Sequence, residues 1–170
     1  PTATREVLGE ERTMVIVQAV TPETEDLVEM TRVNRERLLS MGHEHVCMPL
    51  VPSLDLQGDV PPCGFKPGVI LQVLQEADDD EVIVWMDADA IVTRSIKDIV
   101  STPFGWDVVV TLRDVEDIGT SQPKTNSLNS GVIFFRNSPM VRLFVARWMD
   151  LTRRIKSDQW ALSLMVEEGL

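Results

Sequence analysis

The most informative segment of this chain is VIVWMDADAIV, residues Val82–Val92. Val82–Met86 is an apolar run rich in β-branched and aromatic residues, which predicts a buried central strand. Asp87 and Asp89 follow it directly, where the strand gives way to a turn. In open α/β sheets, ligands bind in the crevice outside the carboxyl ends of the strands. The sequence therefore places two acidic side chains where a ligand is expected.

The spacing of these two aspartates suits a metal ion. Residues i and i+2 of an extended segment point to the same side, so both carboxylates can address one ligand. Two hard oxygen donors suit a divalent cation that in turn holds phosphate oxygens. The alternative is a strand-end turn with two solvated acids, the usual outcome for an isolated Asp-x-Asp. The buried strand in front and the apolar Ala90–Val92 behind favour the metal site here.

The rest of the chain alternates between strand and helix patterns. Apolar runs predict further strands at Met14–Val20, His43–Leu50, Trp106–Leu112 and Ser130–Phe135. Helices are expected at Glu23–Met41, after the Thr21-Pro22 start signal and before Gly42, at Val69–Ala77, and after Ser138-Pro139. The first helix carries Leu27, Met30, Asn34 and Leu38 along one face. This order predicts an α/β fold with a mainly parallel sheet and helices on both faces.

Three polar segments are expected to be loops or turns. Ser53–Gly64 is rich in Pro, Gly and Asp and reads as a mobile loop. Asp114–Ser127 lies between two strands and has the character of an active-site loop. Asp78–Asp80 is interpreted as a solvated helix-to-strand turn, despite its three adjacent carboxylates.

Length and charge limit the class of protein. The 170 residues are expected to form a single domain, 1–170, with a substantial core, since 44% of them are hydrophobic. The net charge of −11 disfavours nucleic-acid binding, which requires clustered Lys and Arg. An acidic protein that binds an anionic ligand needs a positive counter-charge. A metal ion bridging carboxylates and phosphates would supply it.

No apolar run is long enough to span a membrane, and no signal peptide is visible. We therefore expect a cytoplasmic chain, or a lumenal one if it was trimmed from a membrane-anchored precursor. Cys47 and Cys63 fit neither a zinc knuckle nor a disulfide framework and are interpreted as incidental reduced thiols.

Three segments, in order, resemble metal-dependent glycosyltransferases with the GT-A fold. Val82–Ile96 is similar to their donor site: a hydrophobic strand, Asp-x-Asp and a short helix. Ser127–Pro139, SLNSGVIFFRNSP, is similar to their N-[ST]-G strand followed by an R-x-[ST]-P turn. Ser157–Met165, SDQWALSLM, is similar to a D-Q-x-A-L helix start of retaining branches. The galactosyl-, xylosyl- and mannosyltransferase-like branches are the most similar, and the glycogenin-like branch is more distant.

The resemblance implies a role for each residue of the motifs. Asp89 would bind the metal and meet the diphosphate, and Asp87 would bind the metal directly or through water and contact the ribose. The nucleotide base would be lined by the end of the first strand, Ala19, Val20 and Thr21. Lys66 would face the donor. The alternative interpretation of this residue is an ordinary surface lysine.

The remaining implied roles concern the transferred sugar. Asn129, in an N-S-G turn, would form a hydrogen bond with it. Asp158 and Gln159 would act catalytically at the sugar face. Helix capping is a serious alternative for Asp158, because an acid is favourable at a helix N-terminus on dipole grounds alone.

One departure from the family pattern concerns histidine. Such enzymes commonly use a histidine near the carboxyl end as a further metal ligand, but His43 and His45 both precede the Asp-x-Asp. At the start of the second strand they are expected to be half-buried structural residues. Either the third ligand is supplied differently, or the chain lacks its carboxyl-terminal section.

The function implied is transfer of a hexosyl or pentosyl group from a nucleotide-diphosphate donor to a hydroxyl of a carbohydrate or glycoconjugate acceptor. It would depend on Mn²⁺ or Mg²⁺, and the Asp-Gln helix start favours retention. A base for inversion is not evident, although Asp114, Glu116 and Asp117 could supply one. One alternative is a non-catalytic nucleotide-sugar binding module of the same fold. The other is a nucleotidyltransferase, disfavoured because the segment 18–25 lacks the glycine-rich phosphate loop of that class.

Overall fold

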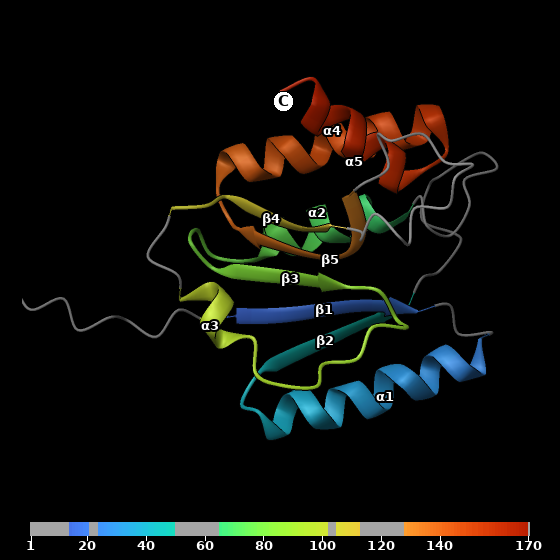
Figure 1. The fold of residues 1–170 in the computed structure, drawn as a ribbon, viewed down its shortest axis with the longest axis vertical. Coiled ribbons are helices and arrows are strands. Elements are labelled where there is room, and N and C mark those ends of the chain that lie inside the picture. Colours follow the sequence, from blue (N-terminus) through green and yellow to red (C-terminus); the bar gives the residue numbers. More distant parts are fainter. Residues whose placement is uncertain (1–13, 21–23, 50–64, 102–104, 113–127, 170) are drawn as a thin grey trace, which may run out of the picture.

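The computed structural model describes residues 14–20, 24–49, 65–101, 105–112 and 128–169. These residues form a five-stranded sheet with the order β2-β1-β3-β5-β4 (Figure 1). The strands are β1 (Met14–Val20), β2 (Glu44–Pro49), β3 (Val82–Met86), β4 (Val108–Leu112) and β5 (Leu128–Arg136). All five residues of β3 are buried, and β3 is the middle strand, as predicted.

The sheet is mainly parallel in direction. β1 pairs in parallel with β2 and with β3, whereas β5 is antiparallel to both β3 and β4. β4 therefore runs in the same direction as β1, β2 and β3, and β5 alone among the described strands is reversed. The α/β prediction is confirmed, and the reversed β5 is a feature that it did not include.

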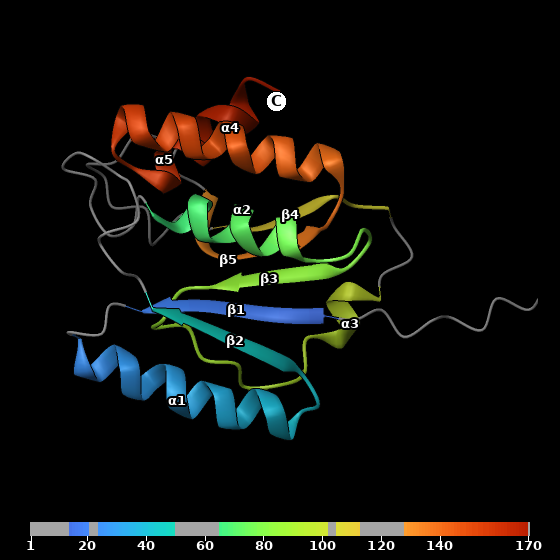
Figure 2. The same ribbon diagram turned by 180° about the vertical axis from the view of Figure 1, so that it is seen from behind.

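Helices cover both faces of the sheet (Figures 1 and 2). They are α1 (Glu25–Ser40), α2 (Lys66–Glu76), α3 (Lys97–Val100), α4 (Pro139–Ile155) and α5 (Asp158–Glu167). One hydrophobic cluster joins the sheet to α2, α4 and α5, and a second joins it to α1 and α3. In the described part of the chain, no helix is both long and apolar enough to cross a bilayer.

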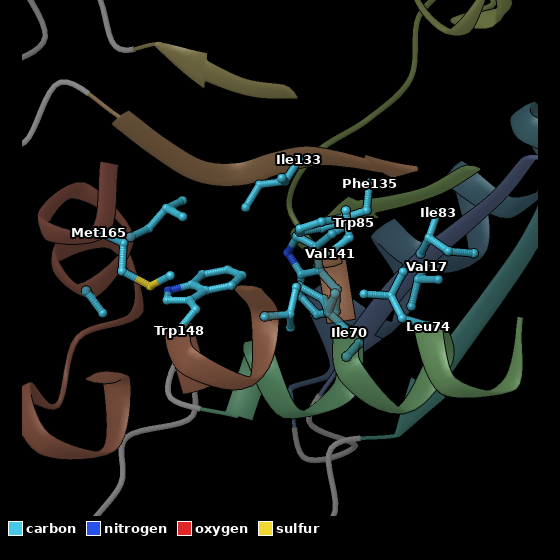
Figure 3. Packing of buried hydrophobic residues seen from close by; sticks show 14 of the residues in the cluster. Val17, Ile70, Leu74, Ile83, Trp85, Ile133, Phe135, Val141, Trp148 and Met165 are labelled. Atoms are coloured by element: carbon cyan, nitrogen blue, oxygen red, sulfur yellow. The ribbon is translucent and has the colours of Figure 1, made fainter. Parts of the chain in front are cut away.

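The alternation of side chains along β3 explains how one strand serves two cores. Ile83 and Trp85 point into the first cluster, where they pack with Phe135 and Trp148 (Figure 3). Val84 and its neighbours at i±2 belong to the second cluster. Because successive side chains of a strand face opposite sides of the sheet, a continuous apolar run is what a strand buried on both faces requires.

The helix boundaries follow local signals. Gly42 has φ +75°, a conformation that favours glycine, and it follows the end of α1 as predicted. The start of α1 differs, since Thr24 is its N-cap and the predicted Thr21-Pro22 signal lies outside the described residues. α2 begins at Lys66, earlier than predicted, with Pro67 in its first turn. Ser138 caps α4, as predicted, by accepting a hydrogen bond from the Val141 N–H.

An irregularity in β5 shapes its amino-terminal part. Val110 of β4 pairs with Ile133, but the next residue, Thr111, pairs with Asn129. The residues between Asn129 and Ile133 therefore form a bulge, a feature common next to active sites. Asn129 thus lies within a strand, and the predicted turn at this position is wrong. The predicted loops Ser53–Gly64 and Asp114–Ser127 fall outside the described residues.

Candidate active site

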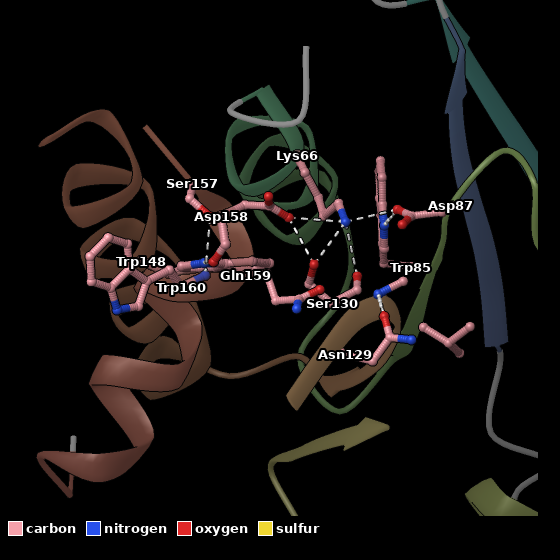
Figure 4. Close-up of polar contacts among 12 residues, drawn as sticks. Lys66, Trp85, Asp87, Asn129, Ser130, Trp148, Ser157, Asp158, Gln159 and Trp160 are labelled. Atoms are coloured by element: carbon pink, nitrogen blue, oxygen red, sulfur yellow. Dashed lines mark hydrogen bonds and ion pairs between the residues drawn. The ribbon is translucent and has the colours of Figure 1, made fainter. Parts of the chain in front are cut away.

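Lys66 joins the Asp-x-Asp strand to the Asp-Gln helix start. Its Nζ lies 2.8 Å from Asp87 Oδ1 and 3.0 Å from Asp158 Oδ2 (Figure 4). The same ammonium donates to the Ser130 carbonyl oxygen at 3.0 Å and to Ser130 Oγ at 3.1 Å. Four contacts from three segments far apart in sequence thus converge on one cation.

The burial of Lys66 excludes the surface-lysine alternative. Only 7% of the residue is exposed. A buried charge needs a paired and hydrogen-bonded environment, which the two carboxylates and Ser130 provide. The Nζ also lies 5.8 Å from the centre of the Trp85 ring, within reach of a cation–π interaction. Lys66 is therefore a fixed, compensated charge at the carboxyl end of β3.

Asp158 is held by its side chain and by its carbonyl oxygen. Ser130 Oγ donates to Asp158 Oδ2 at 2.8 Å, and Trp148 Nε1 donates to the Asp158 carbonyl oxygen at 2.7 Å. The N-cap of α5 is Ser157, whose hydroxyl accepts from the Trp160 N–H at 3.3 Å. Ser157 is therefore the N-cap residue of α5, whereas the Asp158 carboxylate interacts with Lys66 and Ser130.

The two aspartates of the Asp-x-Asp motif have different environments. Asp87 Oδ1 accepts from Trp85 Nε1 at 2.8 Å as well as pairing with Lys66, and its backbone N–H donates to the Gly131 carbonyl at 2.7 Å. Asp89 is exposed and lies in a turn closed by the Ala90 N–H, which donates to the Asp87 carbonyl at 2.9 Å. Because the strand ends at Met86, the rule for side chains of an extended segment does not apply to this pair.

The donor set at this end of β3 fits a divalent cation. Asp87 and Asp89 supply hard carboxylate oxygens, and Lys66 occupies only the Oδ1 side of Asp87. Within the described residues, no group of three His, Cys, Asp or Glu side chains gathers. Mg²⁺ and similar ions commonly use one or two carboxylates and fill the remaining positions with water and phosphate oxygens. Two carboxylates are thus compatible with such an ion.

Asn129 and Gly131 pack closely against Asp87. Asn129 Oδ1 accepts from the Gly131 N–H at 2.8 Å. A Cβ on Gly131 would lie 2.9 Å from Asn129 Oδ1 and 3.2 Å from Asp87 Oδ2, so only glycine leaves both side chains undisturbed. The bulge of β5 thereby brings Asn129 beside the Asp-x-Asp motif, although it lies in a strand.

The other residues predicted for the site are placed as follows. Gln159 is in the first turn of α5, and its side chain extends toward β5 in Figure 4. Ala19 and Val20 are buried at the end of β1, next to β3, with 6% and 7% exposure. Thr21 lies outside the described residues, as do Asp114, Glu116 and Asp117.

The two histidines do not form a joint site. His43 Nε2 lies 3.3 Å from Ser95 Oγ, whereas His45 Nε2 lies 3.0 Å from Gln18 Oε1. Burial lowers the pKa of both imidazoles, and the nearby cations Lys97, for His43, and Arg35, for His45, lower it further. The neutral form of both rings is therefore favoured at neutral pH, and each ring contacts a side chain within the fold.

Three polar residues near the site were missed at the level of sequence: Gln18, Asn34 and Ser130. Gln18 and Asn34 are fully buried, and Gln18 Nε2 donates to the Asp87 carbonyl at 2.9 Å. A signal was present for both, because Gln18 interrupts the apolar run of β1 and Asn34 occupies the apolar face of α1. Ser130 is the middle residue of the N-[ST]-G segment, so a motif contained it, but its contacts with Lys66 and Asp158 depend on distant segments.

Several solved glycosyltransferases have a similar fold. A glycosyltransferase involved in glycosylation of the major capsid of PBCV-1 aligns with a TM-score of 0.59 and 16% identity, over 82% of this chain and 67% of that one. The galactosyltransferase LgtC, solved with donor and acceptor sugar analogues, gives 0.60 and 14%, over 89% and 70%. GlyE from Streptococcus pneumoniae TIGR4 gives 0.57 and 15%, over 92% and 43%. The chain thus spans less than half of GlyE.

Comparison with curated proteins gives no match. The identities to the solved structures are low, so these likenesses establish the GT-A fold alone. Sequence evidence for the family is independent of them: the family model of the nucleotide-diphospho-sugar transferases matches residues 70–170, which is more than half of the chain. The matched segment includes the Asp-x-Asp motif, the bulged strand β5 and the Asp-Gln helix start. This chain belongs to the nucleotide-diphospho-sugar transferase family.

Proposed function

We propose that this chain binds a nucleotide-diphosphate sugar and transfers its hexosyl or pentosyl group to a hydroxyl of a carbohydrate or glycoconjugate acceptor. The observation that carries the proposal is the contact of Lys66 with both Asp87 and Asp158. Through this contact the Asp-x-Asp motif and the start of α5 lie on either side of one ammonium, an arrangement that supports a shared donor site. Family membership supports the same donor class.

The charge of the site supports a metal-dependent donor. Among the described residues, the three carboxylates of Asp87, Asp89 and Asp158 accompany the ammonium of Lys66, so the charge of this part of the site is negative. A diphosphate alone would be repelled by such a site. Mn²⁺ or Mg²⁺ held by Asp87 and Asp89 would reverse that repulsion and neutralise charge that develops on the departing diphosphate. Lys66, already fixed, would keep the Asp87 carboxylate oriented without reorganisation during the reaction.

Two side chains are assigned to the transferred sugar. Asn129 Oδ1 accepts from Gly131, so Nδ2 is the group with which Asn129 would contact a sugar hydroxyl. Gln159 would present its amide oxygen to the anomeric carbon, where positive charge develops in an oxocarbenium-like transition state. The resemblance of this helix start to that of retaining enzymes favours transfer with retention. Ala19 and Val20, at the end of the neighbouring strand β1, would lie against the base, together with Thr21, which follows them in the sequence.

One observation favours a second candidate, a nucleotide-sugar binding module without turnover. The Asp158 carboxylate is bound by both Lys66 and Ser130, which makes it a poor nucleophile or base as it stands. A module of this kind would bind the donor through the same residues. Measured donor turnover separates the two functions, because binding alone is common to both.

The direct test is thermal unfolding of the protein with UDP-, GDP- and dTDP-sugars, each with Mn²⁺ and with EDTA. A ligand that binds only the native state raises the melting temperature. We expect one nucleotide class to raise it in the presence of Mn²⁺ and not in EDTA. No shift with any of the donors would contradict the proposal.

A further inference from the structure

A closed circuit of buried side chains connects the two ends of the Asp-x-Asp turn. The Val92 N–H donates to Asn34 Oδ1 at 2.9 Å, and Asn34 Nδ2 donates to Gln18 Oε1 at 2.9 Å. Gln18 Nε2 then donates to the carbonyl oxygens of Asp87 at 2.9 Å and Ala90 at 3.3 Å. The segment from Asp87 to Val92 is thus tied at both ends to the same pair of amides.

The direction of every bond in this circuit is fixed by the backbone. A backbone carbonyl only accepts, so the Gln18 nitrogen must face Asp87 and Ala90, and its oxygen must face Asn34. A backbone N–H only donates, so the Asn34 oxygen must face Val92. His45 Nε2 lies 3.0 Å from Gln18 Oε1, which requires the tautomer that carries its proton on Nε2.

This polarity excludes most other residues at both positions. Gln18 and Asn34 are both 0% exposed, so each polar atom needs a partner within the protein. A carboxylate at position 18 would face two carbonyl oxygens, and one at position 34 would face the Gln18 oxygen. An apolar residue at either position would leave backbone groups of the turn without a partner. Only side chains with a donor and an acceptor in this geometry complete the circuit.

The circuit matters because, within the part of the chain that the structure describes, no side chain orients the Asp89 carboxylate as Lys66 and Trp85 orient that of Asp87. Asp87 is oriented by Lys66 and Trp85, but Asp89 is exposed in the turn, so its position depends on the backbone between Asp87 and Val92. We propose that Gln18 and Asn34, supported by His45, are positioning residues that hold this turn in the conformation required for cation binding. The inference rests on the proposed function, since it concerns the metal that the donor would need.

The test is the binding of Mn²⁺ alone to Asn34→Ala, measured by the electron paramagnetic resonance of free Mn²⁺. Loss of residues that orient metal ligands typically reduces metal affinity about 10- to 100-fold, and we expect a reduction of this order. The matched control is Asn137→Ala. Asn137 is also 0% exposed and donates to two backbone carbonyls, those of Ala77 and Asp78, in the turn that precedes β3. This control should lose stability but keep its Mn²⁺ affinity.

Two further measurements make the outcome decisive. Amide hydrogen exchange at Val92 should be faster in Asn34→Ala than in the control, because Asn34 accepts from that N–H. His45→Ala, which removes a half-buried side chain, gives a milder variant if Asn34→Ala does not fold. If a folded Asn34→Ala or His45→Ala variant binds Mn²⁺ as tightly as the wild type, the inference is wrong, and the proposed function is unaffected. Absence of Mn²⁺ binding by the wild type would instead overturn the proposed function, and the inference with it.

Discussion

Lys66 Nζ lies 3.0 Å from Asp158 Oδ2, so a buried ion pair ties the start of α2 to the start of α5. The same ammonium contacts Asp87 at 2.8 Å. Helices that flank one face of the sheet are thereby connected to the strand that ends in the Asp-x-Asp motif. We expect these contacts to stabilise this region and to fix the placement of the Asp87 and Asp158 side chains relative to each other.

The first prediction concerns the removal of this cation. Lys66→Met leaves the Asp158 carboxylate buried without a counter-charge. Breaking one partner of a buried pair typically costs about 3–5 kcal/mol in the free energy of unfolding, and we expect a loss of this size by urea denaturation. The double variant Lys66→Met/Asp158→Asn should recover part of that loss, because the uncompensated charge is gone. Losses that simply add would show that the two residues do not interact.

Gly131 provides a test of the packing between Asn129 and Asp87. In Gly131→Ala the new Cβ would lie 2.9 Å from Asn129 Oδ1, which must move, and we expect a loss of about 1–3 kcal/mol together with weaker donor binding. Gly105→Ala is the control, since a Cβ there meets no atom within 4 Å. Calorimetric titration with the donor, beside urea unfolding, measures both effects. A Gly131→Ala protein that matches the control in both would refute the close packing.

His45 is expected to contribute to the pH dependence of the free energy of unfolding. Burial lowers the pKa of His45 in the folded protein below its ordinary value of 6.5, so the unfolded state binds more protons as the pH falls past that value. The stability contributed by neutral His45 is complete above that value and is lost as the pH falls toward the folded-state pKa.

His45→Gln retains a donor for Gln18 and cannot titrate, so its stability should fall less than that of the wild type on acidification. Urea denaturation at a series of pH values from neutral to mildly acidic measures the difference. His43 titrates in both proteins and cancels in the comparison. Parallel stability curves for the two proteins would show that His45 is not the group responsible.

Gln159 separates an enzyme from a binding module. If its amide faces the anomeric carbon, Gln159→Ala should reduce turnover much more than donor affinity, the signature of an interaction made mainly in the transition state. Leu162 and Met165, both 0% exposed, anchor α5 and should keep the variant folded. Steady-state kinetics with saturating donor gives the measurement. Unchanged turnover in a stable variant would remove the catalytic assignment, and Asp158→Asn should be compared beside it as the variant that also disturbs the ion pair.

The strands β1 and β3 could be predicted from the sequence because both are largely apolar on both faces. The predicted ranges Met14–Val20 and Val82–Met86 match the described strands residue for residue. The direction of β5 was not predictable in this way. Strand direction depends on which neighbour a strand pairs with, and the local pattern of Ser130–Phe135 is the same for either direction.

The candidate site was predicted in part for a similar reason. Asp87, Asp89 and Gln159 belong to motifs that are contiguous in sequence, so a resemblance could single them out as candidates. The burial of Lys66 and the contacts of Ser130 arise from segments that meet only in the folded chain. The roles of Gln18 and Asn34 also depend on tertiary contact, although a lone amide within an apolar face is a pattern that favours a buried hydrogen-bonding role.

We propose that Asp89 holds the cation through which the donor binds. The most direct measurement is calorimetric titration of the preferred nucleotide with Asp89→Asn, in Mn²⁺ and in EDTA, beside the control Asp80→Asn. Asp80 is also an exposed aspartate in a turn, and asparagine tolerates its positive φ of 69°. We predict that Asp89→Asn abolishes the Mn²⁺-dependent part of binding with the fold intact, whereas Asp80→Asn binds as the wild type does. Tight nucleotide binding that survives both EDTA and Asp89→Asn would contradict the claim.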